Sequence, residues 1–433
     1  MTAFSEGVVR TVLPNGLTVL VKPVAAAPVA TLWLWYRVGS RHEVPGITGA
    51  SHWVEHMLFK GTAAFPPGEA DRRVARVGGI RNAMTWIDFT TYFHTVPADS
   101  FDLALAIEAD RMVNSPFDPD EFEGERTVII SERQGAENEP PFLLDEEVRS
   151  MAFKVHGYHH NTIGWLCDLE RITRSDLYEH YQRYYAPGNA ILVACGAFDA
   201  ADMTARVGQY FGHLPARPEP PAERSVEPVQ AGERRLMRVG PGDTTYLQVA
   251  YHAPAASHPD YFPMIVLDAI LGGAQAMSLF AEAGPGRSAR LYRALVETGL
   301  AADVTTQLVP TVAPYLYGLY AVVQADVDVA TVETALLAEV QRMLDEPVTA
   351  AELAKAIKQT RAEFIYGAES VTDQAYWLGF AELVASGAWL DSYLDQVAAV
   401  TPADIQRVAH TYLRASNRTV GTFVPQSMND EGD

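Results

Sequence analysis

Cysteine and long apolar runs are both scarce in this sequence, and each scarcity argues against a class of protein. Only two of the 433 residues are cysteines, Cys167 and Cys195, too few for a disulfide framework or a thiolate zinc site. No apolar run reaches the roughly 20 residues that a membrane-spanning helix needs, and the first ten residues lack the pattern of a signal peptide. We therefore expect a cytoplasmic protein without membrane insertion. A chain trimmed of its leader would look the same, which leaves a periplasmic location open.

Basic residues are also in the minority. The chain has 33 lysines and arginines against 54 acidic residues, which gives a formal net charge of −21. This balance argues against a nucleic-acid partner, because phosphate binding needs clustered Lys and Arg. Two explanations for the acidic excess stay open: solubility, or an acidic cavity that attracts basic ligands over long distances.

The length predicts more than one domain, because 433 residues exceed one ordinary hydrophobic core. Residues 213–235 are rich in proline and charge and have no apolar period, which is typical of a linker. We predict a first domain over 1–215, a linker over 216–235 and a second domain over 236–433.

The two halves carry related sequences. Four pairs of identical residues share one constant offset along the chain: Thr173 and Thr401, Asp176 and Asp404, Tyr184 and Tyr412, Asn189 and Asn417. In both copies the threonine precedes a short helical stretch, whose free N–H groups its hydroxyl can cap. An apolar strand follows the asparagine in both copies. The sequence therefore predicts an internal duplication.

The first half mixes strands and helices without the regular rhythm of a parallel sheet. Residues 8–23 predict a hairpin, with Asn15 and Gly16 as a two-residue turn that needs positive φ. The other predicted elements are strands over 28–40 and 80–97 and helices over 47–60, 99–114 and 119–138. This mixture favours an α+β fold of two homologous domains, each a mainly antiparallel sheet packed with helices.

The stretch ITGASHWVEHMLFKGT, residues 47–62, has the pattern H-x-x-E-H. At about 100° per residue, His52 and His56 project from one helix face, one turn apart, with Glu55 on its flank. Two imidazoles, a third ligand and an open position make a catalytic zinc site. The alternative is an amphipathic helix that happens to carry two histidines. The neighbouring side chains are apolar, however, and burying these polar groups would be costly without a partner.

A third ligand has to come from another element. The segment 122–139 supplies Glu125 and Glu132, which lie seven residues apart and so share one helix face. Alone, such a pair is usually a solvated stripe. Beside an H-x-x-E-H helix, it predicts one metal ligand and one carboxylate that holds a ligand in place.

These motifs resemble those of the pitrilysin family of zinc metallopeptidases, the inverzincins, and in particular its short two-domain subunits similar to mitochondrial processing peptidase. The segments LPNGLTVLV, VGSRHE, GASHWVEHMLFKGT, NAMTWIDFTTYF and YYAPGNAILVACG follow the family's order and spacing. The resemblance implies that His52, His56 and Glu132 bind one zinc ion per chain. It also implies that Glu55 is the catalytic base and that Glu125 supports the site.

The resemblance further implies how a substrate is bound. In the family, the strand that corresponds to Asn82 and Ala83 binds the peptide as an added strand, and an exposed sheet edge is suited to that role. The alternative is an ordinary hairpin. The implied function is a zinc-dependent endopeptidase that cleaves short or unfolded peptides in an enclosed chamber, of which this chain forms half of a clamshell.

One part of the family pattern is missing from the second half. Relatives that work alone or as identical pairs carry an Arg and a Tyr there, and these positions fall on Leu295 or Val296 and on Ala302. Residues 290–293 include two arginines and a tyrosine, but at the wrong spacing. We therefore predict a heterodimer whose homologous partner supplies the Arg and Tyr. The alternatives are a self-sufficient homodimeric peptidase and a non-catalytic structural subunit.

Other histidines invite a metal interpretation with less support. His156, His159 and His160 form a cluster that could bind a metal but is more typical of a loop, and His94 fits an ordinary strand side chain. Cys195 lies in an apolar run and is expected to be an inert buried thiol.

Overall fold

The computed structural model describes residues 4–275 and 286–426, which fall into two compact units. Unit 1 comprises Met1–Gln134, His160–Ser225 and Ala368–Asp391, and unit 2 comprises Gly135–His159, Val226–Gly367 and Ser392–Asp433. Each unit therefore takes segments from both halves of the sequence. The predicted domains over 1–215 and 236–433 divide the chain along its sequence, and their boundaries stay a prediction. In the part of the chain that is described, no helix is long and apolar enough to cross a bilayer.

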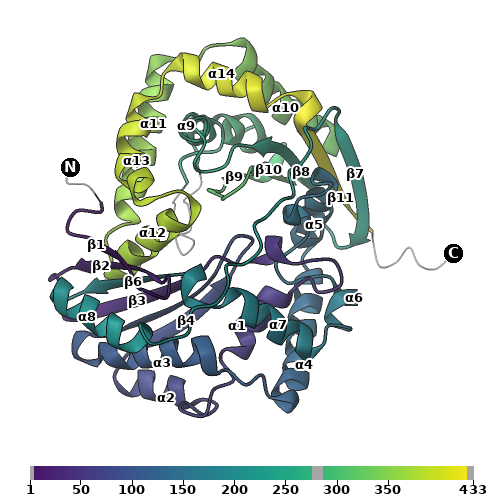
Figure 1. The fold of residues 1–433 in the computed structure, drawn as a ribbon. Helices are drawn as coiled ribbons and strands as arrows, with labels where there is room; N and C mark the ends of the chain where they lie inside the picture. The colour runs from purple at the N-terminus through teal and green to yellow at the C-terminus, as the bar shows by residue number, and fades with distance from the viewer. Residues whose placement is uncertain (1–3, 276–285, 427–433) are drawn as a thin grey trace. The chain divides into compact units, whose positions relative to one another are not determined.

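Unit 1 is built on a six-stranded sheet (Figure 1). Its strands, in spatial order, are β1 (Val9–Val12), β2 (Thr18–Pro23), β6 (Ala190–Gly196), β3 (Val29–Tyr36), β5 (Thr90–Pro97) and β4 (Ile80–Thr85). All neighbours are antiparallel except β2 and β6. The helices are α1 (Ala50–Met57), α2 (Glu69–Arg76), α3 (Phe101–Asn114), α4 (Pro119–Glu137), α6 (Leu166–Leu169), α7 (Arg174–Tyr184), α8 (Ala200–Phe211) and α12 (Val371–Val384). The predicted strands and helices of the first half are confirmed.

The alternation of side chains along β3 explains how both faces of this sheet are buried. Leu32, Leu34 and Tyr36 point into the main hydrophobic cluster of unit 1. Trp33 and Trp35 alternate with them and pack on Tyr376 of α12, with ring centroids 5.3 and 5.2 Å away. Because successive side chains of a strand point to opposite faces, a strand this apolar needs cover on both sides.

The first hairpin forms as predicted, but its turn is different. Gly16 has φ of 91°, whereas Asn15 is not among the described residues with positive φ outside glycine. Gly16 N–H donates to Leu13 O at 2.9 Å, so Pro14 and Asn15 are the central residues of the turn. The proline ring fixes its own φ at a value that suits the first central position of such a turn. The Asn15 side chain instead donates to Phe211 O and to Leu214 O.

Unit 2 is built on a five-stranded sheet. Its strands, in spatial order, are β7 (Arg234–Pro241), β11 (Arg418–Gln426), β8 (Tyr246–Ala253), β10 (Tyr315–Val323) and β9 (Ala301–Leu308). Only β7 and β11 are parallel to each other. The helices are α5 (Pro140–Ala152), α9 (Tyr261–Leu271), α10 (Val329–Asp345), α11 (Ala350–Tyr366), α13 (Gly387–Ala399) and α14 (Pro402–Tyr412). The predicted α+β class with two mainly antiparallel sheets is confirmed.

The duplication is visible in matching contacts. Thr173 and Thr401 each accept a hydrogen bond from the backbone of the aspartate three residues later, so α7 and α14 begin with the same capping box. Asn189 and Asn417 each donate through Nδ2 to the carbonyl oxygen five residues earlier, at 2.9 and 2.8 Å. The predicted repeat therefore extends to individual hydrogen bonds.

The two repeats exchange one helix each. Unit 2 contains a helix from the first half of the chain, and unit 1 contains a helix from the second half. α5 follows α4 in the first half but packs on β11, β8 and β7 in unit 2, whereas α12 follows α11 and packs on β3 and β6 in unit 1. Glycine makes the close approach feasible in both units. A Cβ at Gly379 of α12 would collide with the indole of Trp35, and one at Gly421 of β11 would collide with Val148 of α5.

Candidate metal centre

Helix α1 carries the H-x-x-E-H motif and is shorter than the predicted stretch of 47–60. It begins after Gly49, which has φ of 89° and offers no side chain as a cap. The buried carboxylate of Glu43 takes that role, since it accepts hydrogen bonds from the N–H groups of Gly49 and Ser51, both at 2.7 Å. His160 Nε2 lies 3.0 Å from the same carboxylate. Negative charge at a helix N-terminus is stabilising, so Glu43 fixes the start of α1.

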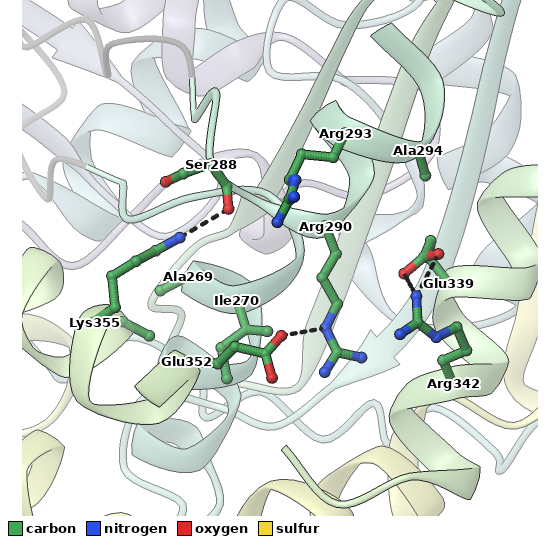
Figure 2. A pocket seen from close by; sticks show the side chains of 11 residues that line it. Ala269, Ile270, Ser288, Arg290, Arg293, Ala294, Glu339, Arg342, Glu352 and Lys355 are labelled. Carbon is green, nitrogen blue, oxygen red and sulfur yellow. Dashed lines mark hydrogen bonds and ion pairs between the residues drawn. The ribbon is translucent and has the colours of Figure 1, made fainter. Parts of the chain in front are cut away.

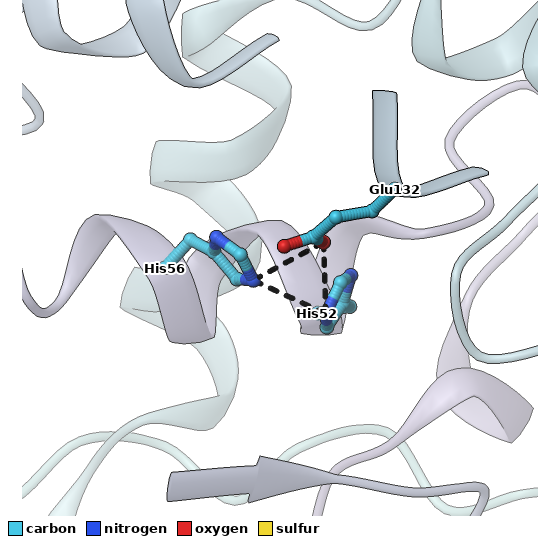
Figure 3. A group of neighbouring side chains, drawn as sticks. All are labelled: His52, His56 and Glu132. Carbon is cyan, nitrogen blue, oxygen red and sulfur yellow. Dashed lines mark hydrogen bonds and ion pairs between the residues drawn. The ribbon is translucent and has the colours of Figure 1, made fainter. Parts of the chain in front are cut away.

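The two histidines of α1 and one glutamate of α4 converge on a common point (Figure 3). The Nε2 atoms of His52 and His56 are 3.2 Å apart, and Glu132 Oε2 lies 3.9 and 3.7 Å from them. Donor atoms on a tetrahedral zinc ion, with bonds of about 2.0–2.2 Å, lie roughly 3.3–3.6 Å from one another. The three donors therefore have the chemistry of a zinc site, and their separations lie within about 0.3 Å of that range.

The second ring nitrogen of His56 is held by Glu125. His56 Nδ1 lies 2.7 Å from Glu125 Oε1 and donates to this carboxylate, so in the neutral ring the Nε2 lone pair faces His52 and Glu132. Lys60 forms an ion pair with the other oxygen of Glu125. A carboxylate that fixes the tautomer and direction of a ligating histidine is the usual partner of a metal ligand.

The electrostatics of the two imidazoles differ. Burial, together with the neighbouring His56, lowers the pKa of His52 to about 3, which keeps this ring neutral. Burial also disfavours protonation of His56, but the hydrogen bond to Glu125 and the charge of Glu132 outweigh it and raise its pKa. A cation between the three donors would replace the proton that His56 otherwise attracts, because a metal binds neutral imidazole.

Glu55 lies between the two histidines in the sequence and is held by the neighbouring strand. Thr85, the last residue of β4, donates its hydroxyl to Glu55 Oε2 at 2.6 Å. Burial raises the pKa of Glu55, although the hydrogen bond from Thr85 acts in the opposite direction. A carboxylate with a raised pKa beside a possible metal position is suited to accept and return a proton.

The two substrate residues implied by the resemblance lie on β4, which pairs only with β5 and so forms an edge of the described sheet. Asn82 is exposed and Ala83 is partly buried. Strand β4 also packs against α1. The exposed edge and the H-x-x-E-H helix are therefore neighbours within unit 1.

Two of the other histidines, His160 and His94, have partners of their own. Within the described ranges, the only group of three His, Cys, Asp or Glu side chains close enough to share a metal is His52, His56 and Glu132. His160 is buried against Glu43. His94 lies in β5 as predicted, fully buried and hydrogen-bonded to Glu108. Cys195 is a buried thiol, as predicted.

Sequence reasoning did not single out three side chains that shape this site: Glu43, Lys60 and Thr85. Glu43 and Thr85 stand in the quoted segments VGSRHE and NAMTWIDFTTYF, but nothing in their spacing reveals their partners. Lys60 lies three residues beyond the end of α1, so helical spacing does not predict its contact with Glu125 either.

Comparisons with known proteins identify two family matches along the chain. Residues 18–164 match the family described as insulinase (peptidase family M16), and residues 171–360 match the domain described as the peptidase M16 inactive domain. The two matches together cover most of the chain. The candidate metal ligands all fall within the first match.

Relatives match over nearly the full length. An uncharacterized zinc protease of Mycobacterium leprae is 28% identical over 98% of this chain and 92% of its own length. The zinc protease PqqE of Helicobacter pylori is 28% identical over 95% and 92%, and the mitochondrial-processing peptidase subunit beta of Lentinula edodes is 27% identical over 95% and 88%. A solved protease from Helicobacter pylori has a TM-score of 0.91 at 27% identity and covers 96% of this chain and 99% of that one.

Proposed function

The chain belongs to the M16 family of peptidases, and from this premise we propose that it is a zinc-dependent endopeptidase acting on short or unfolded peptides. The observation that carries the proposal is the convergence of His52, His56 and Glu132, whose donor atoms lie 3.2 to 3.9 Å apart. Several relatives are named zinc proteases, which supports zinc as the metal. A purely structural subunit would not need these donors and Glu55 to converge.

Zinc, when bound, supplies a Lewis acid that polarises a peptide carbonyl and makes water more acidic. In the proposed mechanism, Glu55 accepts a proton from the attacking water on its free oxygen and returns it to the leaving amine. Thr85 holds the other oxygen of Glu55, and Glu125 holds His56 through Nδ1.

The proposed substrate site is the edge of β4. A peptide added there as a strand would form hydrogen bonds with backbone groups around Asn82 and Ala83. Such backbone pairing selects little for the sequence of the peptide. Because α1 packs against β4, such a peptide would run beside the helix that carries Glu55. This arrangement suits extended, unfolded segments better than folded proteins.

The first test changes Glu55→Gln. This variant should keep one zinc per chain by metal analysis, while turnover of a fluorogenic peptide falls by roughly 10²–10⁴-fold, the usual contribution of a general base. Glu123→Gln is a matched control, because Glu123 is on α4 and 64% exposed. Unchanged turnover in the Glu55 variant would exclude the assigned role.

We further propose that a homologous subunit completes the site with an Arg and a Tyr. Leu295, one of the two positions that correspond to the family's Arg, is fully buried in the apolar core. Relatives that are named as a beta subunit support a subunit role. The isolated chain should bind zinc but cleave peptides poorly, and co-purification from the native organism should recover the partner. Full activity of a rigorously pure chain would favour the homodimeric alternative.

The cytoplasmic location stays a prediction.

A further inference from the structure

Unit 2 contains a pocket that has no part in the proposed peptidase site (Figure 2). Four parts of the chain build it: α9, the segment 288–294, α10 and α11. Its volume is about 300 Å³, which is at the small end of pockets that bind small molecules. The pocket is therefore large enough for a compact ligand and too small for a peptide.

The lining of this pocket is cationic, although the chain as a whole is strongly acidic. Four basic side chains line it against two carboxylates: Arg290, Arg293, Arg342 and Lys355 face Glu339 and Glu352. Among the lining residues the formal surplus is two positive charges, in a protein whose formal net charge is −21. Two carboxylates outside the lining also pair with these cations, Glu297 with Arg293 at 4.0 Å and Glu346 with Arg342 at 3.7 Å. The wall of the pocket itself is therefore cationic, and a cationic wall attracts anions.

Arg290 is the best-buried cation of the group. Its side chain is 11% exposed, and its Nε donates to Glu352 at 3.0 Å. Its Nη1 is buried and has no hydrogen-bond partner within the described part of the chain. Figure 2 shows the guanidinium group between Glu352 on one side and Arg342 on the other. A buried donor of a charged group without an acceptor is costly, and a bound anion would remove that cost.

Both carboxylates of the pocket are already engaged. Burial disfavours the charged form of Glu352, but Arg290 and the capping contacts with Thr349 outweigh it and lower its pKa to about 2. Glu339 accepts from Arg342 Nη1 at 3.0 Å. Each carboxylate therefore neutralises one arginine, and neither supplies the acceptor that Nη1 of Arg290 lacks.

A rare backbone feature brings two lining residues into place. Residues Tyr292–Val296 form a π-helical turn, which carries Arg293 and Ala294 into the pocket wall. Turns of this kind are uncommon and frequently occur at functional sites. Lys355 on α11 donates to Ser288 O at 2.8 Å and ties the start of this segment to the helix.

We propose that this pocket binds a small dianion that carries a phosphate group. Guanidinium groups recognise phosphate through paired N–H donors, and Arg290 offers a free Nη1 where two further arginines line the wall. Three guanidinium groups in one wall, those of Arg290, Arg293 and Arg342, suit the several acceptor oxygens of a phosphate better than the two of a single carboxylate. The proposal does not depend on the peptidase assignment, because every lining residue belongs to unit 2 and the candidate metal centre belongs to unit 1.

Isothermal titration calorimetry tests this proposal, with the full chain in a phosphate-free, low-salt buffer and each anion as the titrant. Inorganic phosphate and glycerol phosphate should both bind, with one site per chain and an affinity that falls as salt is raised. Equal affinities would identify free phosphate as the ligand, and tighter binding of the ester would identify a phosphate monoester. Succinate, a dicarboxylate of the same charge, should bind at least tenfold more weakly. Equal or tighter binding of succinate would overturn the phosphate assignment.

Two variants locate the binding. Arg290→Gln should weaken phosphate binding by roughly 10–100-fold, the effect of losing a charged hydrogen-bond donor. Arg238→Gln is the matched control: it removes one positive charge from unit 2, where Arg238 pairs with Glu147 on the surface, and should leave the affinity unchanged. Absence of phosphate binding by the unmodified chain at millimolar concentrations, or equal loss in both variants, would overturn the proposal.

A third variant covers the case in which Arg290→Gln fails to fold. Ala294→Glu places a carboxylate in the pocket wall at a partly exposed position, so folding should be retained while phosphate binding is abolished. Circular dichroism checks the fold of each variant. Unaltered phosphate binding in a folded Ala294→Glu variant would place the anion elsewhere and refute the assigned pocket.

Discussion

Helices α4 and α11 occupy equivalent positions in the two repeats, but α4 has acidic residues at two positions where α11 has uncharged ones. At the offset that relates the paired residues of the repeats, Glu125 corresponds to Leu353 and Glu132 to Thr360. The two glutamates contact the histidines of α1, whereas Leu353 and Thr360 are buried within unit 2. The two repeats therefore share the positions of their helices but differ in the side chains through which these helices make contacts.

A second pair of groups sharpens this contrast. In unit 1, Glu55 of α1 lies beside Thr85 of β4. In unit 2, Asp268 of α9 lies beside Thr306 of β9, and its side chain is sealed in the core. Burial raises the pKa of both carboxylates, but only Glu55 has histidines on the same helix. The same helix–strand contact thus lies beside two histidines in one repeat and within a buried polar cluster in the other.

The largest effect is expected when the first repeat is made to resemble the second. Glu132→Thr introduces the residue that α11 carries and removes one of three donors, so a four-coordinate site can no longer be completed with one open position. Zinc affinity should fall by more than the roughly 10–100-fold that loss of a supporting carboxylate causes, and peptide turnover should be lost with it. Metal titration measures the first effect and a fluorogenic peptide the second.

Ser131→Thr serves as the control for this change, because it introduces the same residue at an exposed neighbouring position of α4. It should bind zinc like the unmodified chain. If Glu132→Thr bound zinc as tightly as the control, Glu132 could not be the third ligand.

The next prediction concerns the sealed carboxylate of unit 2. Burial raises the pKa of Asp268 from 3.8 to about 7, so between pH 4 and 7 the folded state binds more protons than the unfolded state. The contribution of Asp268 to stability therefore falls as pH rises through this range. Asp268→Asn removes this dependence. The free energy of unfolding of the variant, minus that of the unmodified chain, should therefore be about 2–3 kcal/mol larger at pH 8 than at pH 5.

Urea unfolding at the two pH values measures this difference. Asp303→Asn is a suitable control, because Asp303 lies on β9 and is exposed, and it should change stability equally at both pH values. A constant difference between Asp268→Asn and the unmodified chain would show that Asp268 is ionised in the folded protein at pH 5.

A smaller effect is expected at the supporting carboxylate. Glu125→Gln keeps the shape of the side chain but gives up the charged acceptor of His56 Nδ1–H and the ion pair with Lys60. Zinc affinity should fall by roughly 10–100-fold, with the stoichiometry of one ion per chain retained at saturating metal. Glu121→Gln, which removes a more distant partner of Lys60, should have little effect. Equal losses in both variants would assign the effect to Lys60 rather than to His56.

The sequence predicts the parts of this site that depend on local periodicity. The helix period alone places His52 and His56 on one face. The first hairpin is also predicted, but not its turn, whose central residues are Pro14 and Asn15 rather than Asn15 and Gly16. Glu132 lies far from His56 along the chain, and only the family resemblance singles it out. The capping of α1 by Glu43 depends on tertiary contacts that leave no periodic signal. The exchange of α5 and α12 could not be predicted either, because an apolar helix face does not reveal which sheet will cover it.

The smallest effect tests the helix–strand contact that the two repeats share. Thr85→Val keeps the shape of the side chain but removes the hydrogen bond to Glu55 Oε2. If Thr85 positions the base, kcat should fall roughly tenfold while KM changes little, as expected for loss of one hydrogen bond to a charged group. Thr85→Ser should restore most of kcat, because serine keeps the hydroxyl. A rise in KM with unchanged kcat would instead assign Thr85 to peptide binding at the β4 edge, and the resemblance to Thr306 beside Asp268 would then be structural only.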